Sequence, residues 1–310
     1  MSNKKYNPSE VLHLQQQNSR SKYSPRTAGE YWKINKRTIT IGDNQIDKVR
    51  TRFKENNKTP FFVSRSKVEL FLKCPRCFYF VMKYGFREPG SFPLSLNILV
   101  DSCVKNDMDY CRSHDRIHPV FTHSNLDLKP YNPEDFSTVQ RWRDDMKSYI
   151  GATHLYEKYN WLLCGIIDDV MINNDEELVI IDFKSTTKHQ DLNTFDEVPF
   201  SAGLKIQLEW YNWLFLQKGF SVDNTAYLVY YNAVQDKHLQ HHEDYSLMRF
   251  RRTAIPVECE LDWIEPTIDA MYECLKSPEP PKQDHYALKG KERNKCDQCA
   301  YLNMYKDLNS

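Results

Sequence analysis

Three charged residues in the middle of the chain stand where apolar runs end. Asp168 follows Gly165-Ile166-Ile167, and Asp182 and Lys184 follow Val179-Ile180-Ile181. Carboxylate oxygens are the ligands that Mg²⁺ and Mn²⁺ prefer, and a neighbouring ammonium can orient water or stabilise charge developing on a phosphate. These residues are therefore candidates for a metal-dependent hydrolytic site.

A β-hairpin would bring the three side chains together. Trp161–Ile172 is apolar and rich in β-prone residues, Asn173–Glu177 is polar, and Leu178–Lys184 is apolar again. This pattern predicts two antiparallel strands joined by a loop over 173–177.

The register of this hairpin decides which acidic residue faces the site. If the turn is centred at Asp175, Asp168 lies opposite Asp182, with the Cβ atoms roughly 4.5–5.5 Å apart, and Lys184 shares their face. Asp169 then points to the other face, so we prefer Asp168, although a slip of one residue would reverse the choice. Two carboxylates so close repel each other, and a bound cation removes the conflict. The alternative is a surface hairpin with solvated charges, which the apolar flanks disfavour.

Further segments have the composition of elements that would position the hairpin. Ser64 or Ser66 can cap a helix that Pro75 should bend or restart, and Gly219 suits the end of another helix. The expected strands are 37–41 and 225–232, and the expected helices are 94–112, 142–150, 204–217 and 263–275. This order predicts a single α/β core in residues 61–310.

We interpret residues 1–60 as a polar, basic N-terminal extension with weak structure of its own. Residues 1–90 hold 19 Lys and Arg against 7 Asp and Glu, whereas the formal net charge of the whole chain is zero. Such asymmetry suits a basic face that meets a polyanion, but for residues 1–30 we prefer a solvated, partly disordered tail.

The composition also restricts the class of protein. The chain has 310 residues, of which 40% are hydrophobic and 27% are charged, so it can bury a core as globular proteins do. Its start lacks the apolar core of a signal peptide, and no apolar run is long enough to span a bilayer. We expect a cytoplasmic protein with no membrane partner.

Four of the nine cysteines form two Cys-x-x-Cys pairs, Cys74 with Cys77 and Cys296 with Cys299. Without an export signal, this spacing favours metal ligation over a disulfide framework. A metal held by both pairs would clasp the start of the core to its end. The other cysteines are expected to be small buried hydrophobic residues: Cys103, Cys111, Cys164, Cys259 and Cys274.

The central motifs resemble those of the PD-(D/E)XK nucleases, whose two core motifs are matched by Gly165-Ile-Ile-Asp168 and by Asp182-Phe183-Lys184. The resemblance implies a restriction-endonuclease-like α/β core, in which helices flank a mixed central sheet and a metal clasp joins the N- and C-terminal parts. It also implies that Asp168, Asp182 and the carbonyl of Phe183 hold Mg²⁺ or Mn²⁺, and that Lys184 positions the attacking water.

Two further motifs resemble the RecB-like branch, which includes the CRISPR-associated exonucleases and the AddB nuclease domain. Gln207 and Tyr211 form its Q-x-x-x-Y pattern on one helix face, where both would contact the substrate. The segment Ser66–Arg76 resembles the opening helix, with Cys74 at the first cluster cysteine. The resemblance covers roughly residues 61–305 and keeps the family's order of motifs.

The sequence departs from this branch at two metal-binding positions. Where the branch often has G-x-x-x-H, this chain has Asn97-Ile-Leu-Val-Asp101, so Asp101 is the nearest candidate ligand, with an exposed helix residue as the alternative. Iron–sulfur members have three downstream cysteines, but the third position here lies near Tyr305, and Cys77 would replace it. Four thiolates suit a [4Fe-4S] cluster, which the resemblance favours, or Zn²⁺, which the symmetric pairs favour.

Basic and aromatic side chains near the cysteine pairs are candidates for nucleic-acid contacts. Lys73 and Arg76 flank the first pair, and four basic residues precede the second: Lys289, Lys291, Arg293 and Lys295. Gathered by a metal, these charges would suit phosphates. Tyr79 and Tyr211 could stack on bases, although for Tyr79 we prefer a place in the core.

We therefore expect a metal-dependent nuclease that hydrolyses phosphodiester bonds in DNA, at single-stranded ends by resemblance, in repair, recombination or defence. No helicase motif is present, so unwinding would need a helicase or another repair protein as partner. One alternative is an inactive member of this fold that binds nucleic acid or protein, stabilised by a Zn or Fe–S site. Another is a structural zinc protein with an incidental acidic hairpin. Retention of both Asp182 and Lys184 argues against the inactive member.

Overall fold

The computed structural model describes residues 39–41, 44–46, 50–55, 58–86, 94–143, 151–199, 201–235 and 238–282, together with Cys296 and Cys299. Several sequence predictions fall outside these residues. They are the extension up to residue 38, positions 144–150 of an expected helix, Tyr305, and the basic residues Lys289, Lys291, Arg293 and Lys295.

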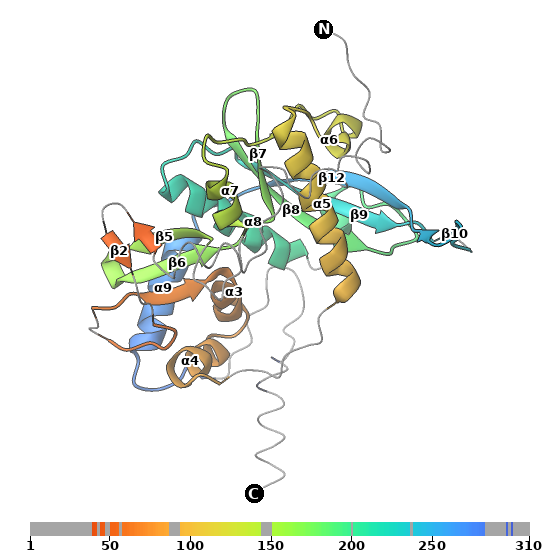
Figure 1. Cartoon of the computed structure of the whole chain (residues 1–310). Helices are drawn as coiled ribbons and strands as arrows, with labels where there is room; N and C mark the ends of the chain where they lie inside the picture. Colours follow the sequence, from red (N-terminus) through yellow and green to blue (C-terminus); the bar gives the residue numbers. More distant parts are fainter. Residues whose placement is uncertain are drawn as a thin grey trace, which may run out of the picture.

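A five-stranded sheet forms the centre of the molecule, in the order β12-β9-β8-β7-β4. Its strands are β4 (Lys129–Pro130), β7 (Asp169–Ile172), β8 (Leu178–Thr186), β9 (Thr225–Ala233) and β12 (Phe250–Glu258). β8 and β9 run parallel, and the other neighbours are antiparallel. Because parallel strands need a crossover, helix α8 (Ser201–Gln217) connects β8 to β9. The predicted α/β core with a mixed sheet is confirmed (Figure 1).

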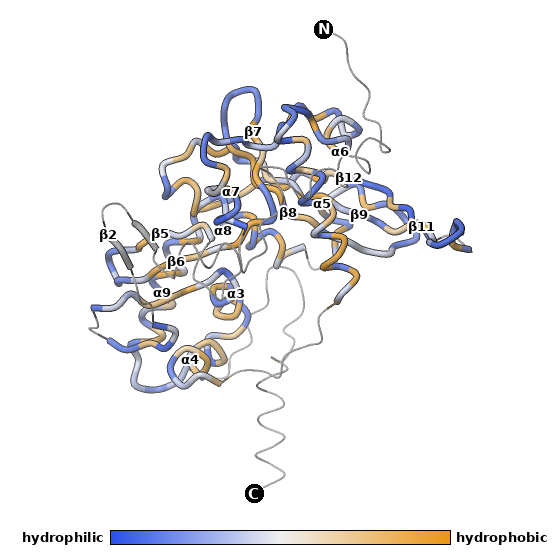
Figure 2. The backbone as a smooth tube through the Cα atoms, in the orientation of Figure 1, coloured by the Kyte–Doolittle hydropathy of each residue, from blue (hydrophilic) through white to orange (hydrophobic). Residues whose placement is uncertain are grey.

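Helices cover both faces of this sheet. Ile180 of β8 belongs to the apolar cluster that includes α8, whereas Val179 and Ile181 belong to a second cluster. That second cluster includes residues of α5 (Ser95–Ser113) and α6 (Pro119–His123). Alternating side chains of a strand point to opposite faces, so β8 begins with the unbroken apolar run Leu178–Ile181 because both of its faces are covered there. Figure 2 shows hydrophobic positions along the central strands.

A second sheet has three strands in the order β3-β6-β5, with β3 parallel to β6. The strands are β3 (Phe61–Ser64), β5 (Ala152–Tyr156) and β6 (Trp161–Gly165), and the short helix η3 (Glu157–Tyr159) precedes β6. Helices α3 (Arg65–Lys73), α4 (Pro75–Tyr84) and α9 (Ile264–Lys276) pack against one another beside it (Figure 1). α3 and α4 meet at Cys74, so the predicted restart at Pro75 is confirmed.

The prediction of one strand over Trp161–Ile172 is wrong. β6 ends at Gly165, and the chain passes from one sheet to the other before β7 begins at Asp169. The sequence hides this break because β6 and β7 are both almost entirely buried, so neither shows a polar face. We call residues 166–168 the seam.

The hairpin of β7 and β8 has the predicted loop and register. Asn173 Oδ1 accepts hydrogen bonds from the N–H groups of Asp175 (3.0 Å) and Glu177 (2.9 Å), which closes the loop. Asp169 pairs with Ile181, so the turn is centred at Asp175 as predicted.

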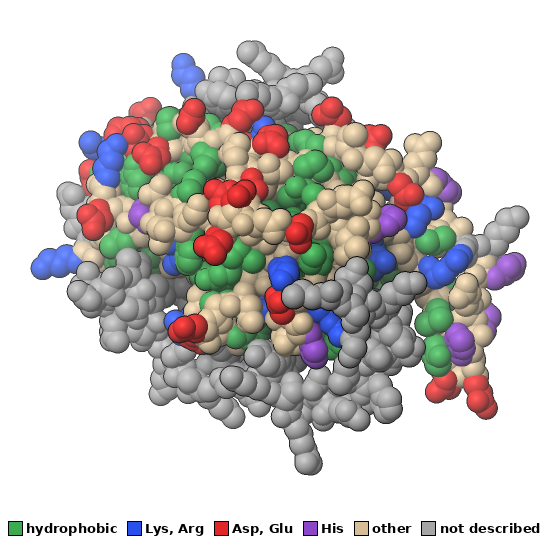
Figure 3. Space-filling model, turned by 90° about the horizontal axis from the view of Figure 1, so that it is seen from above, with side chains coloured by type: hydrophobic (Ala, Val, Ile, Leu, Met, Phe, Trp, Pro, Cys, Tyr) green, Lys and Arg blue, Asp and Glu red, His purple; other side chains and the backbone are tan. Residues whose placement is uncertain are grey.

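The other expected elements agree with the structure within a few residues at α5, α8, β9 and α9. The smaller elements are β1 (Ile39–Ile41), β2 (Asn44–Ile46), α7 (Ser137–Trp142), η4 (Phe195–Glu197), β10 (Gln240–His241) and β11 (Ser246–Leu247). The β10–β11 ribbon projects from the body of the protein (Figures 1 and 3).

Part of the predicted extension packs on the core, because Phe53 makes edge-on ring contacts with Phe61 and Tyr272. Within the described ranges, no helix combines the length and the apolar character that a bilayer crossing would need.

Candidate active site

Asp168 lies in the seam, and its carboxylate links β8 to α5. Oδ2 accepts a hydrogen bond of 2.8 Å from the N–H of Phe183, and Oδ1 accepts one of 3.2 Å from Lys105 Nζ. In the observed register, Asp168 stands opposite Asp182, one place beyond the last pair of the ladder. The side chain is 21% exposed, so a ligand can reach a carboxylate that the protein already holds in place.

β8 carries Asp182 and Lys184 on one face, as the strand period requires. Asp182 Oδ1 accepts a hydrogen bond of 2.6 Å from Gln207 Nε2 on α8. Asp182 Oδ2 is buried, accepts no hydrogen bond and faces the Lys184 ammonium as an ion pair. Lys184 Nζ also donates to the carbonyl oxygen of Phe183 at 3.3 Å. The two core motifs therefore meet around the backbone of Phe183.

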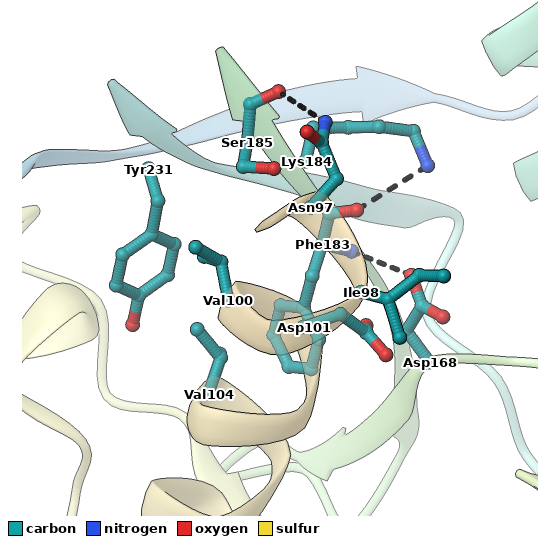
Figure 4. A pocket seen from close by; sticks show the side chains of 10 residues that line it. All are labelled: Asn97, Ile98, Val100, Asp101, Val104, Asp168, Phe183, Lys184, Ser185 and Tyr231. Carbon is teal, nitrogen blue, oxygen red and sulfur yellow. Dashed lines mark hydrogen bonds between the residues drawn. The ribbon is translucent and has the colours of Figure 1, made fainter. Parts of the chain in front are cut away.

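A pocket of about 320 Å³ opens beside these residues (Figure 4). α5 forms one wall, and the end of β8 with the seam forms another. The lining residues are Asn97, Ile98, Val100, Asp101, Val104, Asp168, Phe183, Lys184, Ser185 and Tyr231. Asn97 Nδ2 donates to the carbonyl oxygen of Ser185 at 3.4 Å, which ties α5 to β8. Asp182 is not among the lining residues and is only 1% exposed.

A second lysine lies close to the pocket. Lys105, one helical turn after Asp101 on α5, places its Nζ 2.9 Å from Asp101 Oδ2 and 3.2 Å from Asp168 Oδ1. The carboxylate of Asp101, which the sequence suggested as a metal ligand, is therefore ion-paired with an ammonium. Asp101 and Asp168 face the same cation from α5 and from the seam.

Burial and neighbouring charges shift the two hairpin carboxylates in opposite directions. Desolvation acts to raise the pKa of Asp168, but the ammonium groups of Lys105 and Lys184 and the Phe183 N–H bring that pKa below its ordinary value. Desolvation raises the pKa of Asp182 to about 7, where the nearby Asp168 adds to the shift and Lys184 opposes it. Full ionisation of Asp182 therefore calls for more positive charge than the two lysines provide.

Asp169 takes part in a buried charge network that does not line the pocket. Its Oδ1 accepts a hydrogen bond from Arg112 Nη2, and Arg112 also pairs with Asp109. Arg143 Nη1 donates to Asp109 Oδ1 at 2.7 Å and lies 3.9 Å from Asp169 Oδ2. Asp169 and Arg112 are buried. The network fixes α5 to the start of β7, directly beside Asp168.

Gly165, the first residue of the G-I-I-D motif, leaves room for Tyr211. A Cβ atom at Gly165 would lie 2.6 Å from Tyr211 Cε1. Tyr211 is 4% exposed, and its hydroxyl oxygen lies 3.4 Å from Gln207 Nε2. The Q-x-x-x-Y pair thus supports Asp182 from one face of α8. Contact of Gln207 and Tyr211 with a substrate stays a prediction.

The oxygen atoms at this site suit a hard divalent cation. Asp168, Asp182 and the carbonyl of Phe183 converge on one stretch of β8, and among the described residues the buried Oδ2 of Asp182 faces only the Lys184 ammonium. Mg²⁺ and Mn²⁺ bind such oxygens. These three residues could hold the ion that the paired carboxylates call for.

The four cysteines of the two Cys-x-x-Cys pairs lie together, with all four sulfur atoms within 4.8 Å of one another. Cys74 and Cys77 stand at the junction of α3 and α4, and Cys296 and Cys299 come from the C-terminal part of the chain. The predicted clasp between the two ends of the core is consistent with this arrangement, and four thiols so close can bind a metal.

The fold and the site together define an α/β protein that can hold a divalent cation between two carboxylates beside a lysine. A model of the PD-(D/E)XK nuclease superfamily matches residues 116–304. This chain belongs to that superfamily, whose members are typically metal-dependent nucleases. No curated protein matches the chain. The matched stretch contains all five residues predicted to be catalytic: Asp168, Asp182, Lys184, Gln207 and Tyr211.

Sequence reasoning missed Lys105 and the buried arginines Arg112 and Arg143. Lys105 follows Asp101 at the i+4 spacing of an expected helix, and this was the only local signal. Tyr79 is fully buried and its hydroxyl donates to the carbonyl oxygen of Pro278 at 2.9 Å, so its expected place in the core is confirmed and it cannot stack on a base. One prediction is corrected: Cys103 is exposed on α5 and not part of the core.

Proposed function

We propose that this protein is a metal-dependent nuclease that hydrolyses phosphodiester bonds in DNA, with single-stranded ends as its substrate. The observation that carries the proposal is the hydrogen bond from the Phe183 N–H to Asp168, which joins the two core motifs between Asp182 and Lys184. The Q-x-x-x-Y pair supports the RecB-like branch and hence the choice of DNA ends. We place the activity in DNA repair, recombination or defence, with a helicase or another repair protein as partner.

The site residues have separate roles in this proposal. Asp168, Asp182 and the carbonyl of Phe183 hold Mg²⁺ or Mn²⁺. When bound, the ion supplies Lewis-acid stabilisation of the negative charge on the phosphate. Lys184, held at Asp182 and the Phe183 carbonyl, positions the attacking water.

Two residues of α8 act behind the carboxylates. Gln207 fixes the orientation of Asp182 through its hydrogen bond of 2.6 Å, and Tyr211 keeps Gln207 in place. Orientation matters because a ligand that rotates freely loses affinity for the cation.

The test is cleavage of end-labelled single- and double-stranded DNA by the purified full chain with Mg²⁺ or Mn²⁺. Wild type should shorten the single strand, and Lys184→Ala should lower the rate about 100-fold or more. Lys129→Ala, which removes a half-exposed ammonium paired with Asp115, is the matched control and should retain the rate. The label pattern gives the polarity, and an RNA of the same sequence tests the preference for DNA.

Equal cleavage by wild type and Lys184→Ala would contradict the assigned site. Metal-independent binding of DNA without cleavage of any substrate would favour the alternative, a nucleic-acid-binding member of the fold.

We also propose that the four cysteines hold a single Zn²⁺ ion and not a [4Fe-4S] cluster. One tetrahedral ion with metal–sulfur bonds of about 2.3 Å places its sulfur ligands about 3.8 Å apart. Three of the six sulfur–sulfur distances are 3.3 Å for Cys77 to Cys299, 3.5 Å for Cys77 to Cys296 and 3.7 Å for Cys74 to Cys299, and all six are within 4.8 Å. A four-iron cluster binds each thiolate to a different iron and so separates the sulfurs further.

Metal analysis tests this assignment. Protein purified without oxygen from iron-replete cells should contain one zinc per chain and show no iron–sulfur absorbance. Cys296→Ser should lose the zinc and unfold at a lower temperature, because the metal contributes to folding. Cys103→Ser, which changes an exposed cysteine outside the cluster, should leave both properties unchanged. Four irons with acid-labile sulfide in the wild type would contradict the proposal.

A further inference from the structure

Lys105 occupies the space between two carboxylates at the candidate active site. Its Nζ lies 2.9 Å from Asp101 Oδ2 and 3.2 Å from Asp168 Oδ1, and its side chain is 20% exposed. A lysine whose only role was to stabilise its own helix would pair with Asp101 alone, at the i+4 spacing. The contact with Asp168, 63 positions further along the chain, instead brings its ammonium to a carboxylate of the site.

The formal charges of the site favour one divalent cation over two. Three carboxylates and two ammonium groups, those of Lys105 and Lys184, leave one negative charge when all are ionised: Asp101, Asp168 and Asp182 carry the negative charges. One divalent cation would change this net charge to one positive, and two cations would change it to three positive. A partly buried site pays a large desolvation cost for uncompensated charge, so a second cation is disfavoured while Lys105 remains.

Position leads to the same conclusion. In two-metal nuclease sites the ions lie about 3.5–4 Å apart on opposite sides of a shared carboxylate. Asp168 is the carboxylate that contacts both β8 and α5. Phe183 and Lys184 of β8 lie on one side of it, and Lys105 of α5 lies on the other. An ion bound between Asp101 and Asp168 would have to displace the Lys105 ammonium from both.

We propose that Lys105 takes the place of a second metal ion, so that the site holds one divalent cation and the Lys105 ammonium supplies the other positive charge to the bound phosphate. Asp101 is then the residue that holds Lys105 in position and not a metal ligand. The inference rests on the proposed nuclease function and specifies the number of ions in its site.

The test counts bound ions without substrate. The full chain is titrated with Mn²⁺ by calorimetry, beside Lys105→Met, which has a side chain of similar length without charge. Asp182→Asn is the control that identifies ions of the active site, because those ions should be lost in it. Wild type should bind one such ion. Lys105→Met should bind two, since Asp101 and Asp168 are left without their cation.

A kinetic measurement gives an independent readout. Below saturation, the cleavage rate of wild type should rise with the first power of the Mn²⁺ concentration, and that of Lys105→Met with the second power. Two active-site ions in wild type would overturn the inference. One ion of unchanged affinity in a folded Lys105→Met would overturn it as well. If the proposed nuclease function is wrong, the outcome is different: wild type would not cleave DNA, and Asp182→Asn would bind as many ions as wild type.

Discussion

The N–H of Phe183 donates a hydrogen bond of 2.8 Å to Asp168 Oδ2, just beyond the point where the ladder of β7 and β8 ends. The bond extends the ladder by one hydrogen bond, in which a side-chain oxygen replaces the backbone carbonyl of the partner strand. It keeps the Asp168 carboxylate against the backbone between Asp182 and Lys184.

Asp168→Asn removes the negative charge of the carboxylate but keeps a side chain of the same shape. The amide keeps an oxygen that can accept from Phe183 but loses the ion pair with Lys105, so the variant should stay folded with a lower melting temperature. The cleavage rate with Mn²⁺ should fall about 100-fold or more, because a neutral ligand binds a divalent cation weakly. Asp175→Asn, at the exposed turn of the same hairpin, is the control and should keep the rate. A folded Asp168→Asn variant with wild-type activity would exclude Asp168 from the site.

Gly165→Ala should displace Tyr211. The new methyl group would lie 2.6 Å from Tyr211 Cε1, and overpacking of a core costs about 1–3 kcal/mol of unfolding free energy. Displacement of Tyr211 also disturbs Gln207 and Asp182, so cleavage should fall. Urea denaturation and single-turnover cleavage measure the two effects.

Two further variants check this steric cause. Combination with Tyr211→Leu should recover part of the stability that Gly165→Ala loses. Gly203→Ala on α8, where the nearest atom is a flexible carboxylate oxygen of Glu69 at 3.3 Å, should be neutral or stabilising, because alanine favours helix. Equal losses for both glycine variants would contradict the explanation.

Arg112→Met should destabilise the protein strongly. Arg112 is buried with Asp109 and Asp169, and removal of one partner of a buried ion pair costs about 3–5 kcal/mol. The double variant with Asp169→Asn should be more stable than Arg112→Met alone, because the uncompensated charge is gone. Lys129→Met, at an exposed ion pair with Asp115, should cost less than about 1 kcal/mol. A small effect of Arg112→Met on the urea midpoint would show that Arg143 compensates Asp169 alone.

His118 should make the protein less stable in acid. Burial lowers the pKa of His118 to about 3, with a further contribution from Arg252 and opposition from Asp169. Its neutral Nδ1 accepts a hydrogen bond from the Val120 N–H at the start of α6. The folded state therefore holds fewer protons than the unfolded state between about pH 6.5 and pH 3, so stability is complete above this window and falls as pH decreases through it.

The comparison of wild type with His118→Asn isolates this contribution. Asparagine can still cap the helix but does not titrate. Between pH 7 and pH 5, wild type should lose about 2 kcal/mol more unfolding free energy than the variant, at about 1.4 kcal/mol for each pH unit below 6.5. Parallel losses in the two proteins would show that His118 is accessible to protons in the folded state.

The local part of the site could be predicted from the sequence. The loop at Asn173 and the two apolar runs that flank it determine the register, because a polar side chain closes the turn and a shift by one residue would place Asp169 instead of Asp168 on the face of Asp182. The pairing of Asp168 with Asp182 follows from spacing alone, whereas Gln207 is expected at the site from the family resemblance.

The non-local part could not be predicted in this way. The seam has no signal, because Ile166 and Ile167 continue an apolar run and both adjoining strands are buried. Lys105 looks like one of many charged helix residues, and its partner Asp168 lies 63 positions away. Arg112 gives no hint of burial either, because arginine is usually exposed and only the fold shows that Asp169 compensates it.

The seam has a consequence for attempts to transplant this chemistry. The chain passes from one sheet to the other directly before Asp168. The position of the Asp168 carboxylate therefore depends on both sheets and not on the hairpin alone. A synthetic hairpin with the sequence 168–184 would reproduce the loop, but Asp168 would be its terminal residue with no preceding strand to hold it in position. The proposed site could not then be transferred as an isolated hairpin, because β6 is the strand that brings the chain to the seam.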